Sequence, residues 1–355
     1  MSAEKRSTIA EVAKLAETST ATVSRVLNDT DYPISRELQD RVIQAALELE
    51  YRPDLTAKLR GAMGEQREIG IVLPSISNPF YADLMSAVEE ECAQRSYAPV
   101  LCLSHNSGKL ETRHIQMLRQ KHVAGILLSC VHMDDSFMKL LQALEMPCVL
   151  FDQTYEEYNG LNVGFDFYRG AYMATQYLLQ LGHRDIVFAT DPINRRSRSR
   201  RLEGYKAALR EAEIRFSPRR VLVSTGTDKA YPVPAEFRSG YELGMMLLES
   251  DCFPDAVVAM NDSIAIGIIQ CLKAHNICIP ADISIIGFDN IDISGMIEPA
   301  LTTIDQRSYE MGRRAAKMLL DGIEQVGEPM QNVAIQPQLI QRKSVRKVYR
   351  RHSRR

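Results

Sequence analysis

The sequence predicts an α/β protein, in which a small all-α helix-turn-helix headpiece precedes a two-lobed core of doubly wound parallel sheets. Two observations predict this architecture. Residues 8 to 49 contain three amphipathic segments with helical spacing and short turns between them. Beyond residue 68, short apolar runs alternate with longer amphipathic segments, as expected for parallel strands joined by crossover helices.

The first helix is predicted to begin at Ile9. Thr8 and Glu11 have the spacing of a capping box, in which a hydroxyl and a carboxylate satisfy backbone N–H groups at a helix start. Apolar residues then recur at three- and four-residue steps, which gives the helix one apolar face. These residues are Ile9, Val12, Ala13 and Ala16.

A second helix is predicted after a turn at Glu17 and Thr18, with Ser19 as its N-cap. Its inward residues are Val23, Val26 and Leu27, and the exposed residues that would read bases include Thr20, Ala21, Ser24 and Arg25. A third helix is predicted from Ser35, with an apolar stripe of Leu38, Val42, Ala45, Ala46 and Leu49. Three such faces close one small core, typical of a DNA-reading motif; the alternative is a small helical interaction domain.

The motif TVSRVLN at Thr22 to Asn28, the continuation ELQDRVIQAALELEYRP and the body of the chain resemble the lactose/galactose-repressor family of bacterial transcription regulators. The resemblance extends from about Thr8 to Arg342 and implies a core like that of periplasmic binding proteins. Glu17 stands where this family often has glycine. The expected DNA-binding residues are Thr8, Ser19, Thr20, Ala21, Thr22, Ser24, Arg25, Asn28 and Leu59.

The segment from Tyr51 to Glu68 is predicted to be a hinge. Pro53 ends the third helix, and residues 54 to 60 have room for about two helical turns, too few to be stable alone. In the resembled family two such helices pair and insert a leucine into the minor groove, which implies Leu59 here, with Leu55 as the second candidate. The alternative is a plain, protease-sensitive linker.

Eight strands are predicted in the core from short apolar runs. They are residues 69–73, 99–103, 125–129, 148–151, 185–189, 221–223, 256–260 and 283–288. Helices are predicted near Tyr81, Leu110, Asp135, Tyr168, Arg200, Ser239 and Asp262. The expected domains are a headpiece with its hinge at 1–61, a core at 62–341 and a basic tail at 342–355. Within the core we expect one lobe from about 66–164 and 302–327, and another from about 168–298 and 331–341.

Short polar side chains follow several of the predicted strands, where open α/β sheets bind ligands. They are Ser75, Ser77, Asn78, Asp152, Asp191, Asn261, Asp262 and Asp289. Each of them alone is more typical of a helix cap, but their recurrence indicates a site for a hydroxyl-rich, sugar-like ligand between the lobes. The resemblance implies, as effector-binding residues, Ser77, Phe80, Tyr81, Asp152, Arg201, Asn261, Asp289 and Gln306. Phe167 departs from the family, which often has asparagine there.

Five arginines lie within seven residues beside this predicted site, at positions 195, 196, 198, 200 and 201. One interpretation is a solvated loop from which only Arg201 faces the ligand. The other is an anionic effector, a sugar acid or sugar phosphate, because guanidinium groups bind such anions bidentately.

The net charge of −2 is unevenly distributed. Residues 1–61 hold nine Lys/Arg against ten Asp/Glu, residues 1–341 carry −10, and the last fourteen residues hold eight Lys/Arg and no acid. This terminal segment is interpreted as a disordered, solvated tail, or alternatively as an electrostatic clamp on DNA.

The composition excludes several classes of protein. No apolar run has the length of a signal peptide or of a membrane span, so we expect a cytoplasmic protein. Seven cysteines show no paired spacing, and neither they nor the histidines form a metal-ligand pattern. No phosphate-binding, nucleophile or zinc-protease motif occurs, so we expect no catalytic residues, no metal and no cofactor.

We therefore expect a sequence-specific transcription regulator, acting as a homodimer on a roughly palindromic operator under control of a small sugar-like effector. Repression is the more common role in the resembled family. The alternatives are an activator of the same architecture and a sugar-binding protein without a role in transcription.

Overall fold

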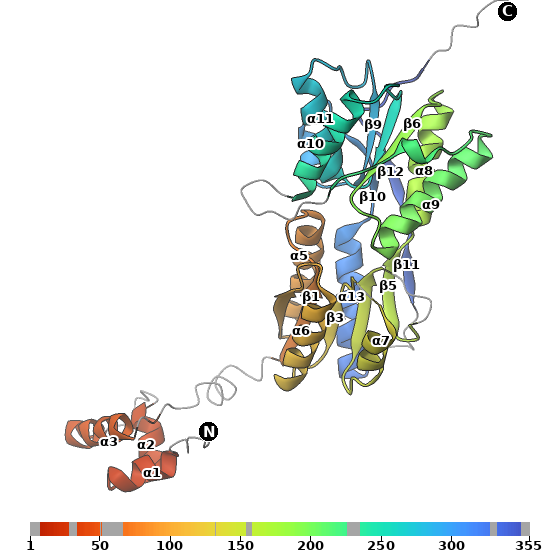
Figure 1. Cartoon of the computed structure of the whole chain (residues 1–355). Coiled ribbons are helices and arrows are strands. Elements are labelled where there is room, and N and C mark those ends of the chain that lie inside the picture. The colour runs from red at the N-terminus through yellow and green to blue at the C-terminus, as the bar shows by residue number, and fades with distance from the viewer. Residues whose placement is uncertain are drawn as a thin grey trace, which may run out of the picture. The chain divides into compact units, whose positions relative to one another are not determined.

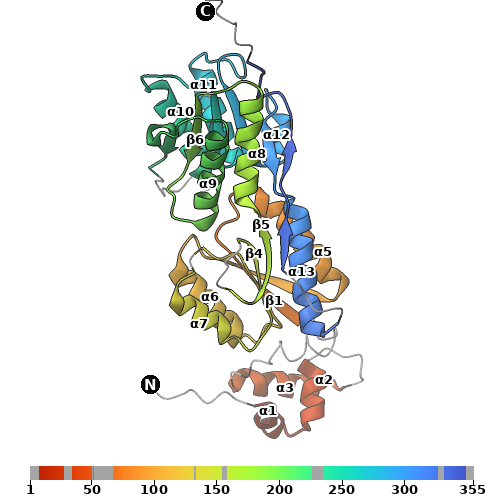
Figure 2. The same cartoon turned by 90° about the vertical axis from the view of Figure 1, so that its right-hand side faces the viewer.

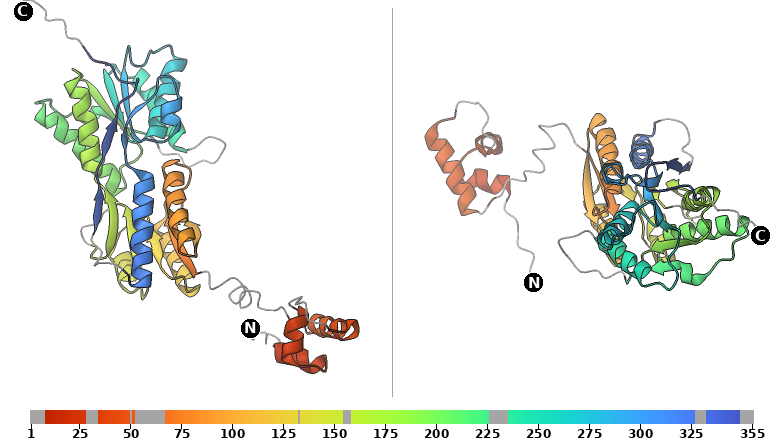
Figure 3. Two further views of the ribbon diagram at one scale, coloured as in Figure 1. Left: turned by 180° about the vertical axis from the view of Figure 1, so that it is seen from behind. Right: turned by 90° about the horizontal axis from the view of Figure 1, so that it is seen from above.

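The computed structural model describes residues 8–27, 34–49, 51, 67–131, 133–153, 158–225, 235–326 and 332–348. The chain forms two compact units, residues 1–66 and 67–355. They are described separately, and Figure 3 gives two further views of their elements. Asn28, Leu59, its alternative Leu55 and the helix predicted over residues 54–60 lie outside the described residues.

The first unit contains α1 (Ile9–Leu15), α2 (Thr20–Leu27) and α3 (Arg36–Glu48). The capping box at the start of α1 is confirmed: the Glu11 side chain accepts the Thr8 N–H (2.7 Å), and the Thr8 hydroxyl accepts the Glu11 N–H (3.4 Å). The third helix was predicted from Ser35, and this residue is the N-cap of α3, where its hydroxyl accepts the Leu38 N–H. The three helices enclose a core whose fully buried side chains are Val12, Val23 and Val42.

Glu17, in the turn between α1 and α2, has a φ of +50°. This is the left-handed region, which costs an L-residue free energy because its Cβ crowds the following carbonyl oxygen, whereas glycine has no Cβ. A glutamate therefore adopts the left-handed conformation at a position where the resembled family often has glycine, and it bears this conformational cost.

Replacing Glu17 with glycine is expected to stabilise the first unit by about 1 kcal/mol, because the strain at this turn is removed. Amide hydrogen exchange of the full chain measures the opening free energy of α1 to α3 directly. Glu17→Ala is the matched control, since it removes the carboxylate but keeps the Cβ. Equal protection in the glycine and alanine variants would contradict the backbone explanation.

The first lobe of the second unit is built on a six-stranded sheet of order β11-β5-β4-β3-β1-β2, in which all paired strands are parallel. The strands are β1 (Arg67–Leu73), β2 (Tyr97–Leu103), β3 (Ile126–Leu128), β4 (Cys148–Asp152), β5 (Leu161–Phe165) and β11 (Val333–Ile335). Helices α5 (Phe80–Gln94) and α13 (Ser308–Glu324) cover one face, and α6 (Gly108–Gln120) and α7 (Asp135–Gln142) the other (Figure 2).

The second lobe is built on a sheet of order β12-β10-β9-β8-β6-β7, in which β12 alone is antiparallel to its neighbour. The strands are β6 (Ile186–Thr190), β7 (Val221–Val223), β8 (Ala256–Ala259), β9 (Ser284–Asp289), β10 (Thr302–Asp305) and β12 (Gln338–Ile340). Helices α8 (Phe167–Gln180) and α9 (Arg196–Glu211) lie on one face, and α10 (Ala235–Leu248) and α11 (Asp262–Ala274) on the other (Figure 1). A short α12 (Ile293–Met296) follows β9.

The predicted assignment of two segments to lobes was wrong. Residues 302–305 form β10 in the second sheet, not the first, because they pair with β9 and β12. Residues 333–335 form β11 in the first sheet, because they pair with β5. The chain therefore crosses between lobes three times, after β5, after β10 and after β11.

The interpretation of residues 342–348 as part of a disordered tail was also wrong. Ser344 is fully buried: its hydroxyl accepts the Thr302 N–H (2.8 Å) and donates to the Ile285 carbonyl (2.6 Å). The Val348 N–H donates to the Leu181 carbonyl (2.8 Å). These bonds fasten the segment to the second lobe as far as residue 348, where the described part of the chain ends.

Candidate functional site

The face of α2 that the sequence predicted for base contacts is exposed. Thr20, Ala21 and Arg25 are exposed, while Thr22 and Ser24 are half-buried and Val23 packs into the core. Short side chains at the start of the helix leave Arg25 as the long, cationic group on this face. The helix therefore presents a surface suited to a groove of DNA, with Arg25 the side chain best able to reach a base edge.

Thr8 and Ser19, two further predicted DNA contacts, take part in helix capping. The Ser19 hydroxyl accepts the Thr22 N–H (3.1 Å) and is hydrogen bonded to the Thr22 hydroxyl (2.9 Å). The Thr8 hydroxyl donates to the Glu11 carboxylate (3.0 Å). Both residues are exposed, so capping does not remove them from the surface.

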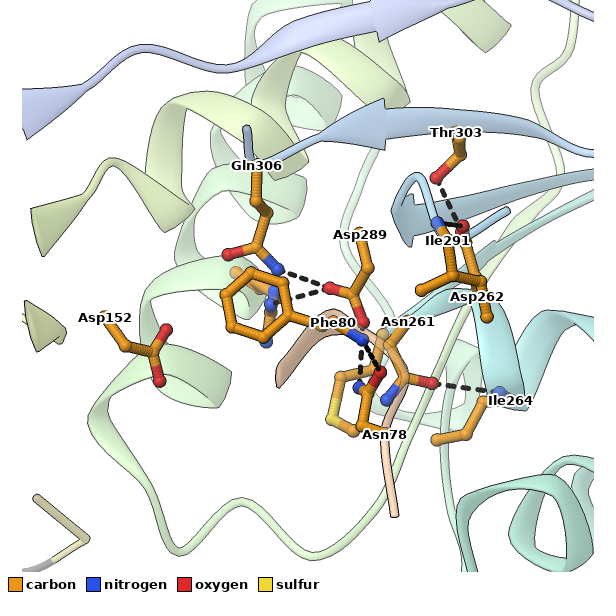
Figure 4. A network of polar contacts seen from close by, with 12 residues as sticks. Asn78, Phe80, Asp152, Asn261, Asp262, Ile264, Asp289, Ile291, Thr303 and Gln306 are labelled. Carbon is orange, nitrogen blue, oxygen red and sulfur yellow. Dashed lines mark hydrogen bonds and ion pairs between the residues drawn. The ribbon is translucent and has the colours of Figure 1, made fainter. Parts of the chain in front are cut away.

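In the second unit, a buried polar cluster forms where the carboxyl ends of strands from both lobes meet (Figure 4). Its centre is the Asp289 carboxylate at the end of β9, only 4% exposed. The Asn78 amide, from the loop after β1 in the first lobe, donates to Asp289 Oδ2 (2.9 Å). The Gln306 amide, directly after β10, donates to Oδ1. One carboxylate thus joins both lobes.

Arg201 supplies the positive charge beside this carboxylate. Its guanidinium contacts two aromatic rings, with its carbon 4.5 Å from the Phe167 centroid and 4.2 Å from that of Phe288. One terminal nitrogen is 3.9 Å from Asp289 Oδ1. Burial lowers the pKa of Arg201, and the carboxylates of Asp289 and Asp152 oppose that shift. The Nε of Arg201 and the Oε1 of Gln306 are both buried without a hydrogen-bond partner among the described residues.

Asp152, at the end of β4, forms the first lobe's part of the cluster. Its Oδ2 accepts hydrogen bonds from the Tyr81 hydroxyl (3.4 Å) and the Ser129 hydroxyl (3.3 Å). Burial raises the pKa of Asp152, and the cations of Arg201 and Arg195 oppose the shift. Burial also raises the pKa of Asp289 well above its ordinary value. Keeping these buried carboxylates ionised therefore costs free energy. A ligand that donates hydrogen bonds to them would reduce that cost.

Backbone strain coincides with these two carboxylates. Asp152 has a φ of +72° and Asp289 a φ of +120°, regions that residues with side chains rarely adopt. Strain of this kind costs about 1 to 3 kcal/mol per residue and is concentrated at functional sites. Its presence at the ends of β4 and β9, in different lobes, supports a ligand site between them.

Asn261 and Asp262, which both follow β8, have different tasks. The Asn261 Oδ1 caps α11 by accepting the Ile264 N–H (2.9 Å). The Asp262 carboxylate accepts from the Ser294 hydroxyl (2.6 Å), the Ile291 N–H (3.1 Å) and the Thr303 hydroxyl. Figure 4 shows that Asp262 points away from Asp152 and the cluster, towards β10. Asp262 thus fastens the turn that follows Asp289.

The arginine run divides into residues with separate partners. Arg198 is 3.5 Å from Asp191 and donates to the Pro192 carbonyl (2.7 Å). Arg200 is exposed and pairs with Glu203 (2.7 Å). Arg201 alone of the five is buried. Arg195 is half-buried, and its cation opposes the rise that burial causes in the pKa of Asp152. This arrangement favours the interpretation in which Arg201 faces the ligand, with Arg195 near Asp152, over one in which all five arginines do.

The structure brings most of the predicted effector residues together, but Asn78 takes the place in the cluster that was expected for Ser77. Phe80 and Tyr81 are buried and pack edge to face (5.1 Å between centroids), and Asp152, Arg201, Asp289 and Gln306 form the cluster. Ser77 is exposed, and its N–H donates to the Ser75 hydroxyl. The side chain that reaches Asp289 belongs to Asn78, which the sequence marked only as a polar residue after a strand. Phe288 was missed because an aromatic residue inside an apolar strand gives no signal of a site.

A helix-turn-helix unit joined to two α/β lobes with a polar cluster at their strand ends defines a DNA-binding transcription regulator. Comparison with known proteins agrees. Residues 8–54 match the family described as bacterial regulatory proteins, lacI family, and residues 175–345 match a periplasmic binding protein-like domain.

The HTH-type transcriptional repressor PurR of Pasteurella multocida is 33% identical over 340 residues, which covers 96% of this chain and 98% of the relative. The ribose operon repressor of Haemophilus influenzae is 31% identical, with coverage of 95% and 98%. The chain therefore belongs to the lacI family, which confirms the resemblance and the prediction of a transcription regulator rather than an enzyme.

Two solved structures show the same architecture. The transcriptional regulator CelR in complex with cellobiose is 28% identical, with a TM-score of 0.67 and coverage of 96% of this chain and 100% of that one. A LacI family regulator from Enterococcus faecium with bound ribose is 28% identical, with a TM-score of 0.69 and coverage of 80% and 100%. Within the described residues, no helix is both long and apolar enough to cross a membrane.

The buried Asp262 generates a prediction about pH. Burial raises its pKa to about 6, so the folded state binds a proton more tightly than the unfolded chain. The stability from this group is fully present below its ordinary pKa and is lost as the pH rises through about 6. The Asp262→Asn variant should therefore lose less stability than the wild type between about pH 4 and 7, by a few kcal/mol at most.

Urea unfolding followed by circular dichroism at a series of pH values measures this difference in slope. Asp251→Asn, an exposed carboxylate of the same lobe, is the control and should follow the wild type. If the free energy of unfolding had the same pH dependence in the wild type and in Asp262→Asn, the raised pKa of Asp262 would be contradicted.

Proposed function

We propose that this protein is a repressor whose DNA affinity is controlled by a small, neutral, sugar-like effector bound at the cluster around Asp289. The observation that carries the proposal is the bond from Asn78 of the first lobe to Asp289 of the second. A ligand that binds the Asp289 carboxylate competes with this bond, so effector binding and the relative orientation of the lobes are coupled.

A neutral ligand is favoured over an anionic one by the charges around the cluster. Asp152 and Asp289 are both buried there, and Arg201 is the buried cation that faces them. Burying a third negative charge would be opposed by both carboxylates. Hydroxyl groups, by contrast, donate to carboxylates and accept from guanidinium and amide N–H groups. The unpartnered Arg201 Nε and Gln306 Oε1 provide one further donor and one further acceptor.

The relatives support this choice of ligand class. The solved structures of CelR and of the Enterococcus faecium regulator, each 28% identical to this chain, contain cellobiose and ribose respectively. Both are neutral sugars. The aromatic side chains of Phe80 and Tyr81, buried beside the cluster, offer the apolar surface on which a sugar ring packs.

Operator DNA is proposed to be read by α2 in the major groove, with two copies of the chain on a roughly palindromic site. Leu59 is proposed as the minor-groove wedge, and the cytoplasm as the location. A homodimer is supported by large apolar side chains exposed on the second unit, such as Ile76, Ile293 and Met296, which is 78% exposed. The headpiece and hinge are proposed to span residues 1–61, and the core is proposed to begin at residue 62 and to include residues 342–348, which are bonded to the second lobe.

Calorimetric titration with matched pairs of sugars tests the effector class. Ribose and cellobiose should bind more tightly than ribose 5-phosphate and cellobionate, because the acidic partners meet two buried carboxylates. Asp289→Asn should weaken binding of the neutral sugar by about ten- to a hundredfold, the range for a hydrogen bond to a charged group. Asp251→Asn is the control. Tighter binding of the acidic partners would contradict a neutral effector.

Selection from a randomised DNA library tests the role of Arg25. Arg25→Ala should relax the preference at one position of each half-site, by about 1 to 3 kcal/mol, because a bidentate contact with a guanine is lost. Thr20→Ala, on the same exposed face, should change the preference less. An unchanged consensus for the Arg25 variant would remove this residue from base reading.

A further inference from the structure

Helix α6 and the turns that flank it carry an exposed surface without acidic groups. The exposed side chains between residues 105 and 122 are His105, Asn106, Lys109, Arg113, Gln116, Arg119, Gln120, Lys121 and His122. The acid of this helix, Glu111, is fully buried and accepts the Val131 N–H (2.9 Å). The surface therefore carries four lysine or arginine charges, and we call it the α6 basic face.

The cations of the α6 basic face are not neutralised within the chain. None of Lys109, Arg113, Arg119 and Lys121 forms an ion pair in the described part of the structure. On α13, by contrast, Arg314 and Lys317 each face an acid one turn away. Residues 1–341 as a whole carry a net charge of −10, so a face with four cations and no exposed acid is locally opposite in sign to the chain and attracts an anionic partner.

The carboxyl end of α6 lies beside the point where the chain enters the core. The Ala124 N–H donates to the Glu68 carbonyl (2.7 Å), so Lys121, three residues earlier, is close to the first residues of β1. Glu68 is exposed at this end, and the neighbouring cation of Arg67 offsets its charge. At the same end, Gln116, Arg119, Gln120 and His122 line a shallow surface hollow of about 490 Å³.

The length of the linker keeps this end of α6 within reach of bound DNA. Fifteen residues separate Tyr51, after α3, from Arg67. Even when fully extended they span about 55 Å at most. The linker therefore sets an upper limit on the distance between α2 and the start of β1, and the α6 cations nearest to the start of β1 are those of Arg119 and Lys121.

We propose that the α6 basic face binds the phosphate backbone of the duplex that flanks the operator. The first sixty-one residues hold nine basic and ten acidic side chains, so the helix-turn-helix unit brings no net positive charge to DNA. Phosphate contacts supply most sequence-independent affinity. The α6 basic face provides the missing attraction, while α2 provides the base contacts. This assignment depends on DNA binding alone and is independent of the effector.

The test compares pairs of substitutions that remove the same charge from the full-length protein. Arg119→Gln with Lys121→Gln removes two cations at the linker end of α6, and Lys109→Gln with Arg113→Gln removes two at the far end. The control is Arg215→Gln with Arg219→Gln, two exposed arginines of the second lobe. All are surface changes, and thermal unfolding monitors that each variant folds.

The measurement is the slope of log affinity against log salt, on the site recovered by randomised selection, in duplexes of about 20 and about 50 base pairs. The linker-end pair should lower the slope by about 2 to 4 on the longer duplex, because two cations are lost from each of two protomers and each phosphate contact contributes about 0.9. Its affinity should fall on the order of tenfold there, and much less on the short duplex. The far-end pair should have a smaller effect.

Three results would overturn the proposal. One is an unchanged slope in the linker-end pair. Another is an equal loss in the control pair, which would indicate a general effect of net charge. The third is an equal loss on both duplexes, which would place the contact within the operator itself. If the linker-end pair leaves DNA binding intact, an acidic protein becomes the partner to seek, and the assignment to DNA is wrong.

Discussion

The buried carboxylate of Asp289 is the group on which the arrangement of the core depends. An isolated buried charge costs several kcal/mol, and this one is compensated by an amide from each lobe and by the nearby guanidinium of Arg201. The strained backbone at its own position adds to the cost. The cost of burying the carboxylate and the stabilisation from its hydrogen bonds nearly offset each other. A ligand that replaces one of these hydrogen bonds can therefore change the preferred orientation of the lobes.

The rings that enclose Arg201 explain why the charge stays in place. Phe167 begins α8 at the first crossover between lobes, and Phe288 belongs to β9 beside Asp289. A guanidinium in contact with two aromatic rings has little freedom to turn towards water. The asparagine that the family often has at position 167 would not provide a ring. Phe167 therefore fixes the direction of the Arg201 guanidinium at the crossover between the lobes. A change in lobe orientation would alter the backbone at this crossover.

The sequence predicted local features more closely than long-range ones. The starts of α1 and α2 were predicted to the residue because a capping side chain and its N–H partner lie three positions apart. All eight predicted strands exist, since buried parallel strands are continuous apolar runs. Strands β5, β10, β11 and β12 were missed, and two segments were assigned to the wrong lobe. Short strands of mixed polarity are defined by their pairing partners, which periodicity does not reveal.

The same distinction applies to the candidate site. Residues at strand ends were found because the sheet topology brings strand ends together, whatever the details of packing. The resemblance implied Ser77 as an effector contact, whereas the side chain that reaches Asp289 is that of the next residue, Asn78, because the direction of a loop side chain depends on its contacts and not on its spacing. The charged residues were harder to interpret from the sequence. The run of five arginines was conspicuous, yet only Arg201 of the five is buried, while four cations with no ion pair among the described residues share the exposed face of α6. In this protein, the pairing of charges therefore says more about function than their clustering along the chain.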